Sequence, residues 1–339
     1  MEKKINYLKE NETISLIAPS FGCTFEPYFT RLKVAINNLE EDGFVISKGD
    51  NIFLANHKIR SNTARRCAKE FMDAYESESS AIISVGGGEI MCEILPYIDF
   101  DKIAKLPHKF FMGFSDNTNL TYTLATISEV PTIYGPCAPA FAFKPYELNA
   151  KDSLDLLMGK VNKTKGYPFW ERNKVKSEEP LLDHVYDEIK TLRLYPNKEV
   201  NVEGRLLGGC LDCLITLCGT KFDKTSEYLE KYKEDGFIWF LEACDLSPVG
   251  IQRALFQLRQ AGWFKYCKGF IMGRPLCYRK RMFGITHYTA IKEALKGINV
   301  PLIMDADLGH FAPSMPIITG VKAKVFAKAN QFEIEYVDL

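Results

Sequence analysis

Apolar runs and amphipathic segments alternate along the first 130 residues, and this alternation limits the folds that the chain can adopt. The segments between the apolar runs repeat their apolar residues every three or four positions, as an amphipathic helix does. The pattern predicts strands at 15–18, 44–47, 81–85 and 110–113, and helices at 28–42, 62–75 and 119–128. This order is typical of an α/β fold, a parallel sheet with helices on both faces, whose ligands collect at the carboxyl ends of the strands.

The character of the sequence changes between residues 144 and 201. Residues 160–179 are rich in Lys, Glu, Asn and Pro and show no sustained period. Farther along, the pattern predicts strands at 204–207, 237–241, 269–272, 302–304, 324–327 and 331–336, and helices at 251–261 and 286–295. Since 339 residues suggest two domains, we predict an N-terminal domain over 1–165, a connecting segment over 166–202 and a strand-rich C-terminal domain over 203–339.

Composition and charge argue against several classes of protein. The 43 basic and 43 acidic residues cancel, so no electrostatic field favours nucleic acid. The first residues are polar, unlike a signal peptide, and no apolar run approaches the about 20 residues of a membrane span. Ten irregularly spaced cysteines indicate reduced thiols, so we expect a cytoplasmic protein. Cys210 and Cys213 form a Cys-x-x-Cys pattern without a second pair; we interpret them as structural thiols and expect no metal or cofactor.

A serine occupies the turn between the strand at 110–113 and the helix that follows. The sequence there is Gly113-Phe114-Ser115-Asp116, and such a turn exposes the serine hydroxyl while nearby amides can bind an oxyanion. The usual hydrolase turn has a second glycine two residues after the serine, where this chain has Asn117. Ser115 is therefore either a nucleophile or a cap of the helix.

A serine nucleophile needs a base and a third group that orients the base. His310 follows the apolar run 300–304 and comes directly after Gly309, which lets the backbone bend where the imidazole must be presented. Glu242 is the first charged residue after the apolar run 236–241. A loop histidine or a strand-end glutamate is common, but together with Ser115 they form a candidate triad. Asp245 or Asp305 would be the next candidate for the carboxylate.

Three glycines, residues 86–88, follow the strand predicted at 81–85. They match neither a dinucleotide-binding pattern nor a phosphate loop. Two interpretations stay open. The glycines either form only a tight turn or bring the backbone close to Ser115, so that an amide near Gly88 joins the amide of Asp116 in an oxyanion hole.

The motifs around the candidate triad resemble the LD-carboxypeptidase family of serine peptidases, which includes the microcin C self-immunity proteins. They lie at 113–116, 240–242 and 307–310, and similar segments occur at 15–20, 82–88, 96–100, 134–136, 203–211 and 273–275. The resemblance implies a Rossmann-like first domain that carries Ser115 and a mixed β domain that carries Glu242 and His310. The site would then lie between the domains, a common location for pockets.

We therefore expect a serine carboxypeptidase, forming a homodimer, that cleaves an amide bond next to a terminal carboxylate. The resemblance suggests the terminal D-alanine of a murein tetrapeptide as leaving group, a step of peptidoglycan recycling. An alternative substrate for the same chemistry is a peptidyl or aminoacyl nucleotide. Trp170 would then bind the substrate by stacking on the nucleobase, unless it packs at the domain junction. A noncatalytic small-molecule-binding module is an alternative of another class, and it leaves the three polar residues unexplained.

Overall fold

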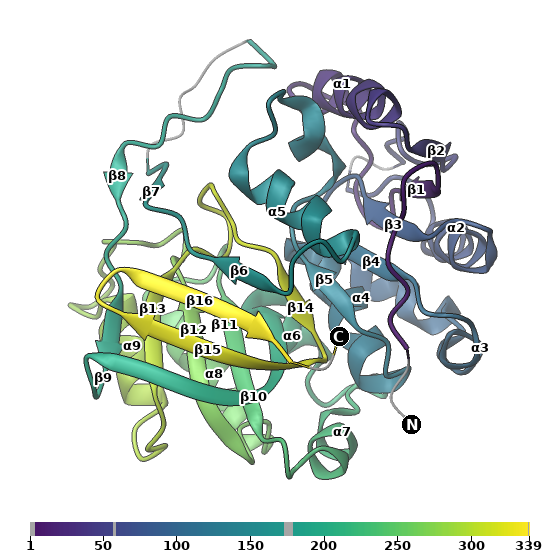
Figure 1. The fold of residues 1–339 in the computed structure, drawn as a ribbon. Coiled ribbons are helices and arrows are strands. Elements are labelled where there is room, and N and C mark those ends of the chain that lie inside the picture. Colours follow the sequence, from purple (N-terminus) through teal and green to yellow (C-terminus); the bar gives the residue numbers. More distant parts are fainter. Residues whose placement is uncertain (1–3, 57–58, 173–178, 338) are drawn as a thin grey trace.

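The computed structural model describes residues 4–56, 59–172, 179–337 and 339, which form a six-stranded and an eight-stranded sheet (Figure 1). The six-stranded sheet has the order β14-β5-β4-β3-β1-β2, and its first five strands in the chain run parallel. Its strands are β1 (Thr13–Ile17), β2 (Val45–Lys48), β3 (Ala81–Ser84), β4 (Phe110–Gly113), β5 (Thr132–Tyr134) and the antiparallel β14 (Ile317–Thr319).

The parallel strands of this sheet are connected by α1 (Tyr28–Glu41), α2 (Ala64–Glu76), α3 (Phe100–Lys105) and α4 (Thr118–Ile127), with the short 3₁₀ helices η1 (Met91–Tyr97) and η2 (Ser115–Asn117). After β5 the chain forms η3 (Ala138–Ala142) and α5 (Leu148–Leu157). In α2 one face is buried, and the side chain of Thr63 caps its first turn by accepting from the amide of Arg66. In α4 every residue from Thr118 to Thr126 is buried, because the helix contacts strands of both sheets.

The eight-stranded sheet has the order β6-β16-β15-β10-β11-β12-β13-β9. Its central strands β10 (Glu199–Cys210), β11 (Phe237–Glu242), β12 (Cys267–Gly273) and β13 (Leu302–Ala306) are parallel. They are flanked by the antiparallel strands β6 (Lys163–Lys165), β9 (Arg193–Tyr195), β15 (Lys322–Lys328) and β16 (Gln331–Tyr336). A separate two-stranded sheet is formed by β7 (Phe169–Trp170) and β8 (Glu188–Ile189). The helices here are α6 (Leu211–Leu217), α7 (Thr225–Lys231), α8 (Pro248–Gln260) and α9 (His287–Ala294).

The two sheets exchange strands. After β13 the chain leaves the second sheet, passes through residues 307–316 and adds β14 to the first sheet, beside β5. Conversely, β6 follows α5 but pairs with β16 of the second sheet. Both clusters of buried apolar side chains contain residues of both sheets, for example Ile14 with Ile334 and Ile82 with Trp239, so the two halves share their interior.

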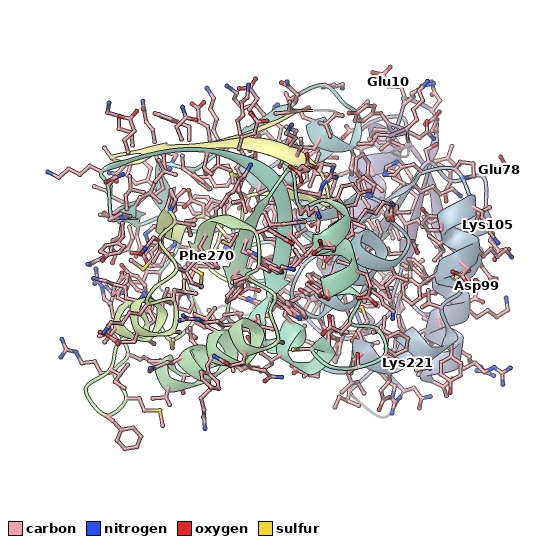
Figure 2. All side chains as sticks on the ribbon, turned by 90° about the horizontal axis from the view of Figure 1, so that it is seen from below. Glu10, Glu78, Asp99, Lys105, Lys221 and Phe270 are labelled. Carbon is pink, nitrogen blue, oxygen red and sulfur yellow. The ribbon has the colours of Figure 1, made fainter. Side chains whose placement is uncertain are left out.

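Charged side chains project outward around this interior. Phe270 lies inside the molecule, while the labelled charged residues reach solvent (Figure 2): Glu10, Glu78, Asp99, Lys105 and Lys221. No helix in the described part of the chain is long and apolar enough to cross a bilayer.

The predicted fold class, a parallel α/β sheet followed by a mixed strand-rich part, is confirmed. The long strands begin and end within a few residues of the predicted positions, with the exception of β10, which starts five residues earlier than predicted. Its polar first half pairs with β15, while its apolar second half pairs with β11. The boundaries near residues 165 and 203 stay a prediction.

Candidate active site

The turn after β4 holds Ser115 in a conformation that few residues other than glycine adopt. Its φ angle is 62°, in the left-handed region, which is a strained position that functional sites favour. A Cβ atom on Gly113 would lie 2.6 Å from Cγ of Asn117, so the turn needs glycine there. Asn117 donates from Nδ2 to the carbonyl oxygens of Phe114 and Gly86, both at 2.9 Å. Asn117, which stands where the usual hydrolase turn has its second glycine, therefore stabilises the turn.

The hydroxyl of Ser115 contacts His310 instead of capping α4. Oγ lies 2.9 Å from Nε2 of His310, and Nδ1 of His310 lies 2.9 Å from Oε2 of Glu242. Ser115 follows β4, Glu242 ends β11 and His310 follows β13, so strand ends from both sheets meet at this point. The structure thus brings together all three residues of the candidate triad.

The two other candidate carboxylates do not bond to His310. Asp305 accepts a hydrogen bond of 2.6 Å from the hydroxyl of Tyr288, and Asp245 is exposed. Within the described residues, neither is hydrogen-bonded to His310, whose ring nitrogens bond to Glu242 and Ser115.

The electrostatics of Glu242 and His310 favour a charged pair. Burial by itself raises the pKa of Glu242, which is 1% exposed, but His310 and the hydroxyl of Tyr134 hold that pKa below its ordinary value. Burial by itself lowers the pKa of His310, but the carboxylate of Glu242 outweighs it and raises that pKa well above the ordinary value. The pair therefore favours the protonated imidazole more than an isolated histidine does.

The glycine loop after β3 approaches Ser115 closely. A Cβ atom on Gly87 would lie 3.4 Å from Oγ of Ser115, and one on Gly88, whose φ is 149°, would lie 2.0 Å from Oγ of Ser20. Ser20 in turn donates to the buried carboxylate of Asp116 at 2.6 Å. The amide of Asp116 belongs to the first turn of a helix, where N–H groups have no partner within the helix. The geometry matches the close-approach interpretation, while the oxyanion hole stays a prediction.

Comparison with known proteins shows the family of the chain. Residues 14–135 match the LD-carboxypeptidase N-terminal domain, and residues 203–325 match the LD-carboxypeptidase C-terminal domain. The chain belongs to the LD-carboxypeptidase family. The Microcin C7 self-immunity protein MccF of Escherichia coli is 26% identical over 275 residues, which cover 78% of this chain and 77% of MccF.

Solved structures share the fold of this LD-carboxypeptidase family member. MccF in complex with aspartyl sulfamoyl adenosine superposes with a TM-score of 0.82 at 22% identity over 98% of each chain. The muramoyltetrapeptide carboxypeptidase of Oxalobacter formigenes superposes with a TM-score of 0.72 at 20% identity, over 96% of this chain and 99% of that one. At these identities the similarity concerns the fold.

A cavity of 670 Å³ opens over Ser115 and His310 and is lined by both halves of this family member. Its lining includes exposed aromatic side chains. Phe25 and Tyr28 are 48% and 40% exposed, and their rings meet edge to face at 5.5 Å. Arg31 also lines the cavity and is held by the carbonyl oxygens of Pro180 and Leu182. The lining of the cavity therefore includes exposed aromatic rings as well as Ser115 and His310 of the candidate triad.

Trp170 is packed within the protein beside this cavity. It is 2% exposed, and its ring centroid lies 5.1 Å from that of Phe311 and 5.3 Å from that of Tyr278. The guanidinium carbon of Arg274 lies 4.7 Å from the same centroid. This is the packed arrangement that we gave as the alternative for Trp170, and a contact with substrate stays a prediction.

The Cys-x-x-Cys pair lies behind Ser115. Cys213 contacts the carbonyl oxygen of Ser115 through a 3.6 Å hydrogen bond from Sγ. The pKa of both thiols is raised, and burial contributes to this in each. All ten cysteines are free, and no group of three or more His, Cys, Asp or Glu side chains in the described residues could hold a metal ion. The pair therefore has the surroundings of structural thiols.

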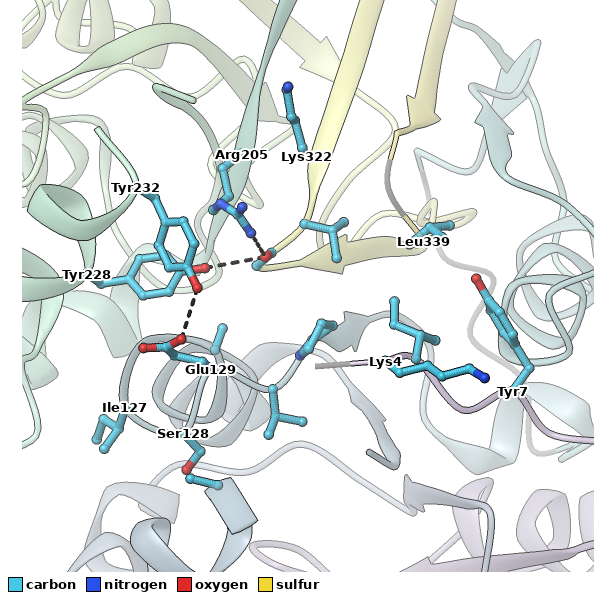
Figure 3. A pocket seen from close by; sticks show the side chains of 17 residues that line it. Lys4, Tyr7, Ile127, Ser128, Glu129, Arg205, Tyr228, Tyr232, Lys322 and Leu339 are labelled. Carbon is cyan, nitrogen blue, oxygen red and sulfur yellow. Dashed lines mark hydrogen bonds between the residues drawn. The ribbon is translucent and has the colours of Figure 1, made fainter. Parts of the chain in front are cut away.

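A second cavity, of 630 Å³, lies at the other end of α4 and does not contain the candidate triad (Figure 3). Its polar groups bond to one another. Arg205 and Tyr228 donate to the carbonyl oxygen of Gly320, and the hydroxyl of Tyr232 donates to Glu129 at 2.9 Å. The first two contacts tie β10 and α7 to the turn after β14, and the third ties the segment after α4 to the residue that follows α7.

Two site residues were not predicted from the sequence. Ser20, which binds Asp116, and Tyr134, which binds Glu242 at 2.7 Å, both lie in segments that resemble the family. Their residue types carried no signal of their own, because a buried hydroxyl is meaningful only once its partner is known.

Proposed function

We propose that the protein is a serine carboxypeptidase with Ser115 as nucleophile, His310 as general base and acid, and Glu242 as the group that orients His310. The observation that carries the proposal is the continuous hydrogen-bonded path from Oγ of Ser115 through both imidazole nitrogens to Glu242. A base held by a carboxylate beside a serine on a strained turn is the arrangement that acyl transfer requires.

The reaction then proceeds in two halves. Nε2 of His310 takes the proton of Ser115 as Oγ attacks the carbonyl carbon, and the amides of Gly88 and Asp116 stabilise the oxyanion. His310 returns the proton to the leaving amine as the C–N bond breaks, which leaves an ester on Ser115. A water molecule, deprotonated by His310, attacks the ester and releases the carboxylic acid, and the proton returns to Oγ.

As substrate we propose a murein tetrapeptide that loses its terminal D-alanine, as peptidoglycan recycling requires. Membership of the LD-carboxypeptidase family supports this choice. The substrate enters the 670 Å³ cavity, which suits a short peptide better than a protein chain.

A peptidyl or aminoacyl nucleotide is the second candidate. It is supported by the similarity to the Microcin C7 self-immunity protein, whose structures hold aminoacyl-sulfamoyl nucleosides, and by the exposed rings of Phe25 and Tyr28 in the lining of the cavity. Aromatic rings of this kind can stack on a nucleobase.

The test compares turnover of the two substrates by wild-type protein and by Ser115→Ala. Release of D-alanine from a murein tetrapeptide and of aspartate from aspartyl sulfamoyl adenosine are measured under the same conditions. We expect a higher kcat/KM for the tetrapeptide, and a loss of about 10⁴-fold or more in Ser115→Ala with an unchanged melting temperature. If neither substrate is hydrolysed, or if the variant keeps more than about a tenth of the activity, the proposal is wrong.

We further propose that the protein is cytoplasmic and forms a homodimer. The ten free cysteines support a reducing compartment. Sedimentation of the purified protein tests the dimer, and a monomer across the micromolar range would contradict it.

A further inference from the structure

We propose that Tyr134 is a positioning residue, which ties the carboxylate of Glu242 to the backbone of Ser115 and thereby sets the pH at which His310 becomes a base. This inference rests on the proposed function, because it assumes that Ser115 and His310 carry the reaction.

The hydroxyl of Tyr134 contacts two parts of the site at once. It donates to Oε1 of Glu242 at 2.7 Å and accepts from the amide of Ser115 at 3.0 Å. Because Oε2 of Glu242 bonds to His310, each carboxylate oxygen has its own donor. Tyr134 therefore closes a ring of contacts that runs from the backbone of Ser115 to Glu242, to His310 and back to the side chain of Ser115.

Packing leaves the phenol little freedom to move. Tyr134 ends β5, its exposed fraction is 0%, and its backbone pairs with Ile317 of β14. Its ring centroid lies 6.4 Å from that of Phe114, which precedes Ser115, and 5.7 Å from that of Phe240, which precedes Glu242 by two residues. The ring thus spans the junction where strands of the two sheets supply the triad.

The hydroxyl of Tyr134 donates its proton to Glu242. Burial and the carboxylate of Glu242 raise the pKa of Tyr134 well above its ordinary value, so the hydroxyl stays protonated. One lone pair is already used by the amide of Ser115, so the proton is directed to Glu242. The amide of Ser115 is consequently turned toward the phenol, which leaves the amide of Asp116 as the donor of this turn for an oxyanion.

The hydrogen bond from Tyr134 also limits how strongly Glu242 attracts the imidazolium. A donor on Oε1 disperses the negative charge, which lowers the negative potential at His310. Without the hydroxyl, the carboxylate holds the proton of His310 more tightly, and the pKa of His310 rises further. The acid limb of the pH profile should then move to higher pH.

The other ionisable groups around the pair remain in place in such an experiment. They belong to the end of β10 and the start of α6, to the loop after β11 and to the glycine loop. Those that face Glu242 are Cys210 and Cys213, and those that face His310 are Cys244 and Glu89. A change in the pH profile of a Tyr134 variant therefore reports the loss of the phenol itself.

The test uses Tyr134→Phe, with Tyr122→Phe as a matched control. Tyr122 is 1% exposed and its hydroxyl bonds to Thr225 at 2.8 Å, away from the triad. The readout is the rate of phosphonylation of Ser115 by a fluorophosphonate as a function of pH, which needs no knowledge of the natural substrate. Melting temperatures are recorded over the same pH range, because the midpoint reports the site only where the folded fraction stays constant.

We expect Tyr134→Phe to react about 10- to 100-fold more slowly, as for loss of a hydrogen bond to a charged group, with a midpoint at higher pH than wild type. Tyr122→Phe should keep the wild-type midpoint. A wild-type midpoint in Tyr134→Phe, or equal effects in both variants, overturns the inference while leaving the proposed function intact. If wild-type Ser115 is not phosphonylated at all, the proposed function itself fails.

Discussion

Replacement of Glu242 by glutamine removes one charge from the site with little change in shape. The buried carboxylate accepts one hydrogen bond on each oxygen, from Tyr134 and from His310. An amide offers only one acceptor. If its nitrogen faces His310, the imidazole must carry its proton on Nε2 and cannot accept the proton of Ser115. If its nitrogen faces Tyr134, the phenol loses the acceptor of its proton.

The expected loss in kcat follows from the wrong tautomer and from the missing charge. Serine hydrolases that lose this carboxylate slow by about 10⁴-fold, which corresponds to about 5 kcal/mol of transition-state stabilisation. The same change should move the acid limb of the pH profile of kcat/KM. Glu242 raises the pKa of His310, so its loss lowers that pKa, and the fall in kcat/KM on acidification should occur at lower pH than in the wild type.

The assay is kcat/KM for D-alanine release over the pH range, with folding checked by melting temperature. In the wild type the acid limb should lie above about 6.5, the ordinary histidine value, because the pKa of His310 is raised. Wild-type activity with an unchanged pH profile in Glu242→Gln would refute the reasoning. Glu242 would then be only a buried strand-end residue without a role in orienting His310.

Three further changes test other parts of the site. Gly88→Ala should lose most activity, because the added Cβ would lie 2.0 Å from Oγ of Ser20, beside the predicted oxyanion hole. Gly219→Ala is the control and should keep its activity, since Gly219 also has a positive φ, 81°, but no atom lies within 4 Å of the added Cβ. Equal kcat values in the two variants would argue against the oxyanion hole. Trp170→Ala should lower the free energy of unfolding by about 3–5 kcal/mol, whereas a rise in KM for the nucleotide alone at unchanged stability would mean that Trp170 binds substrate. Prolonged chelation should leave turnover unchanged, since the proposed base is a histidine; activity lost to chelation and restored by zinc would contradict the serine mechanism.

The parallel part of the fold and the candidate triad could be predicted because each depends on local sequence. Buried parallel strands are continuous apolar runs, and a polar residue directly after such a run lies at the carboxyl edge of the sheet. Ser115 and Glu242 follow this pattern closely, whereas His310 lies six residues beyond the apolar run 300–304. That the three residues meet between two sheets was expected from the resemblance to the family and does not follow from the local pattern.

Features that depend on long-range pairing could not be predicted. Strands β5 and β14 have three residues each, too few to show a period, and β14 joins β5 across more than 180 residues of chain. The packing of Trp170 is set by Phe311 and Arg274, which are distant in sequence. The contact between Tyr134 and Glu242 could not be predicted for the same reason, because nothing near Tyr134 in the chain indicates that its hydroxyl meets Glu242.

The most direct test of the account is to identify the residue that a fluorophosphonate modifies. Wild-type protein is labelled above and below the acid limb, digested and analysed by mass spectrometry. The account predicts a single adduct on Ser115, which forms faster at the higher pH and is absent from Ser115→Ala and much reduced in His310→Ala. No adduct, or an adduct on another residue that persists in Ser115→Ala, would contradict the assignment of Ser115 as the nucleophile.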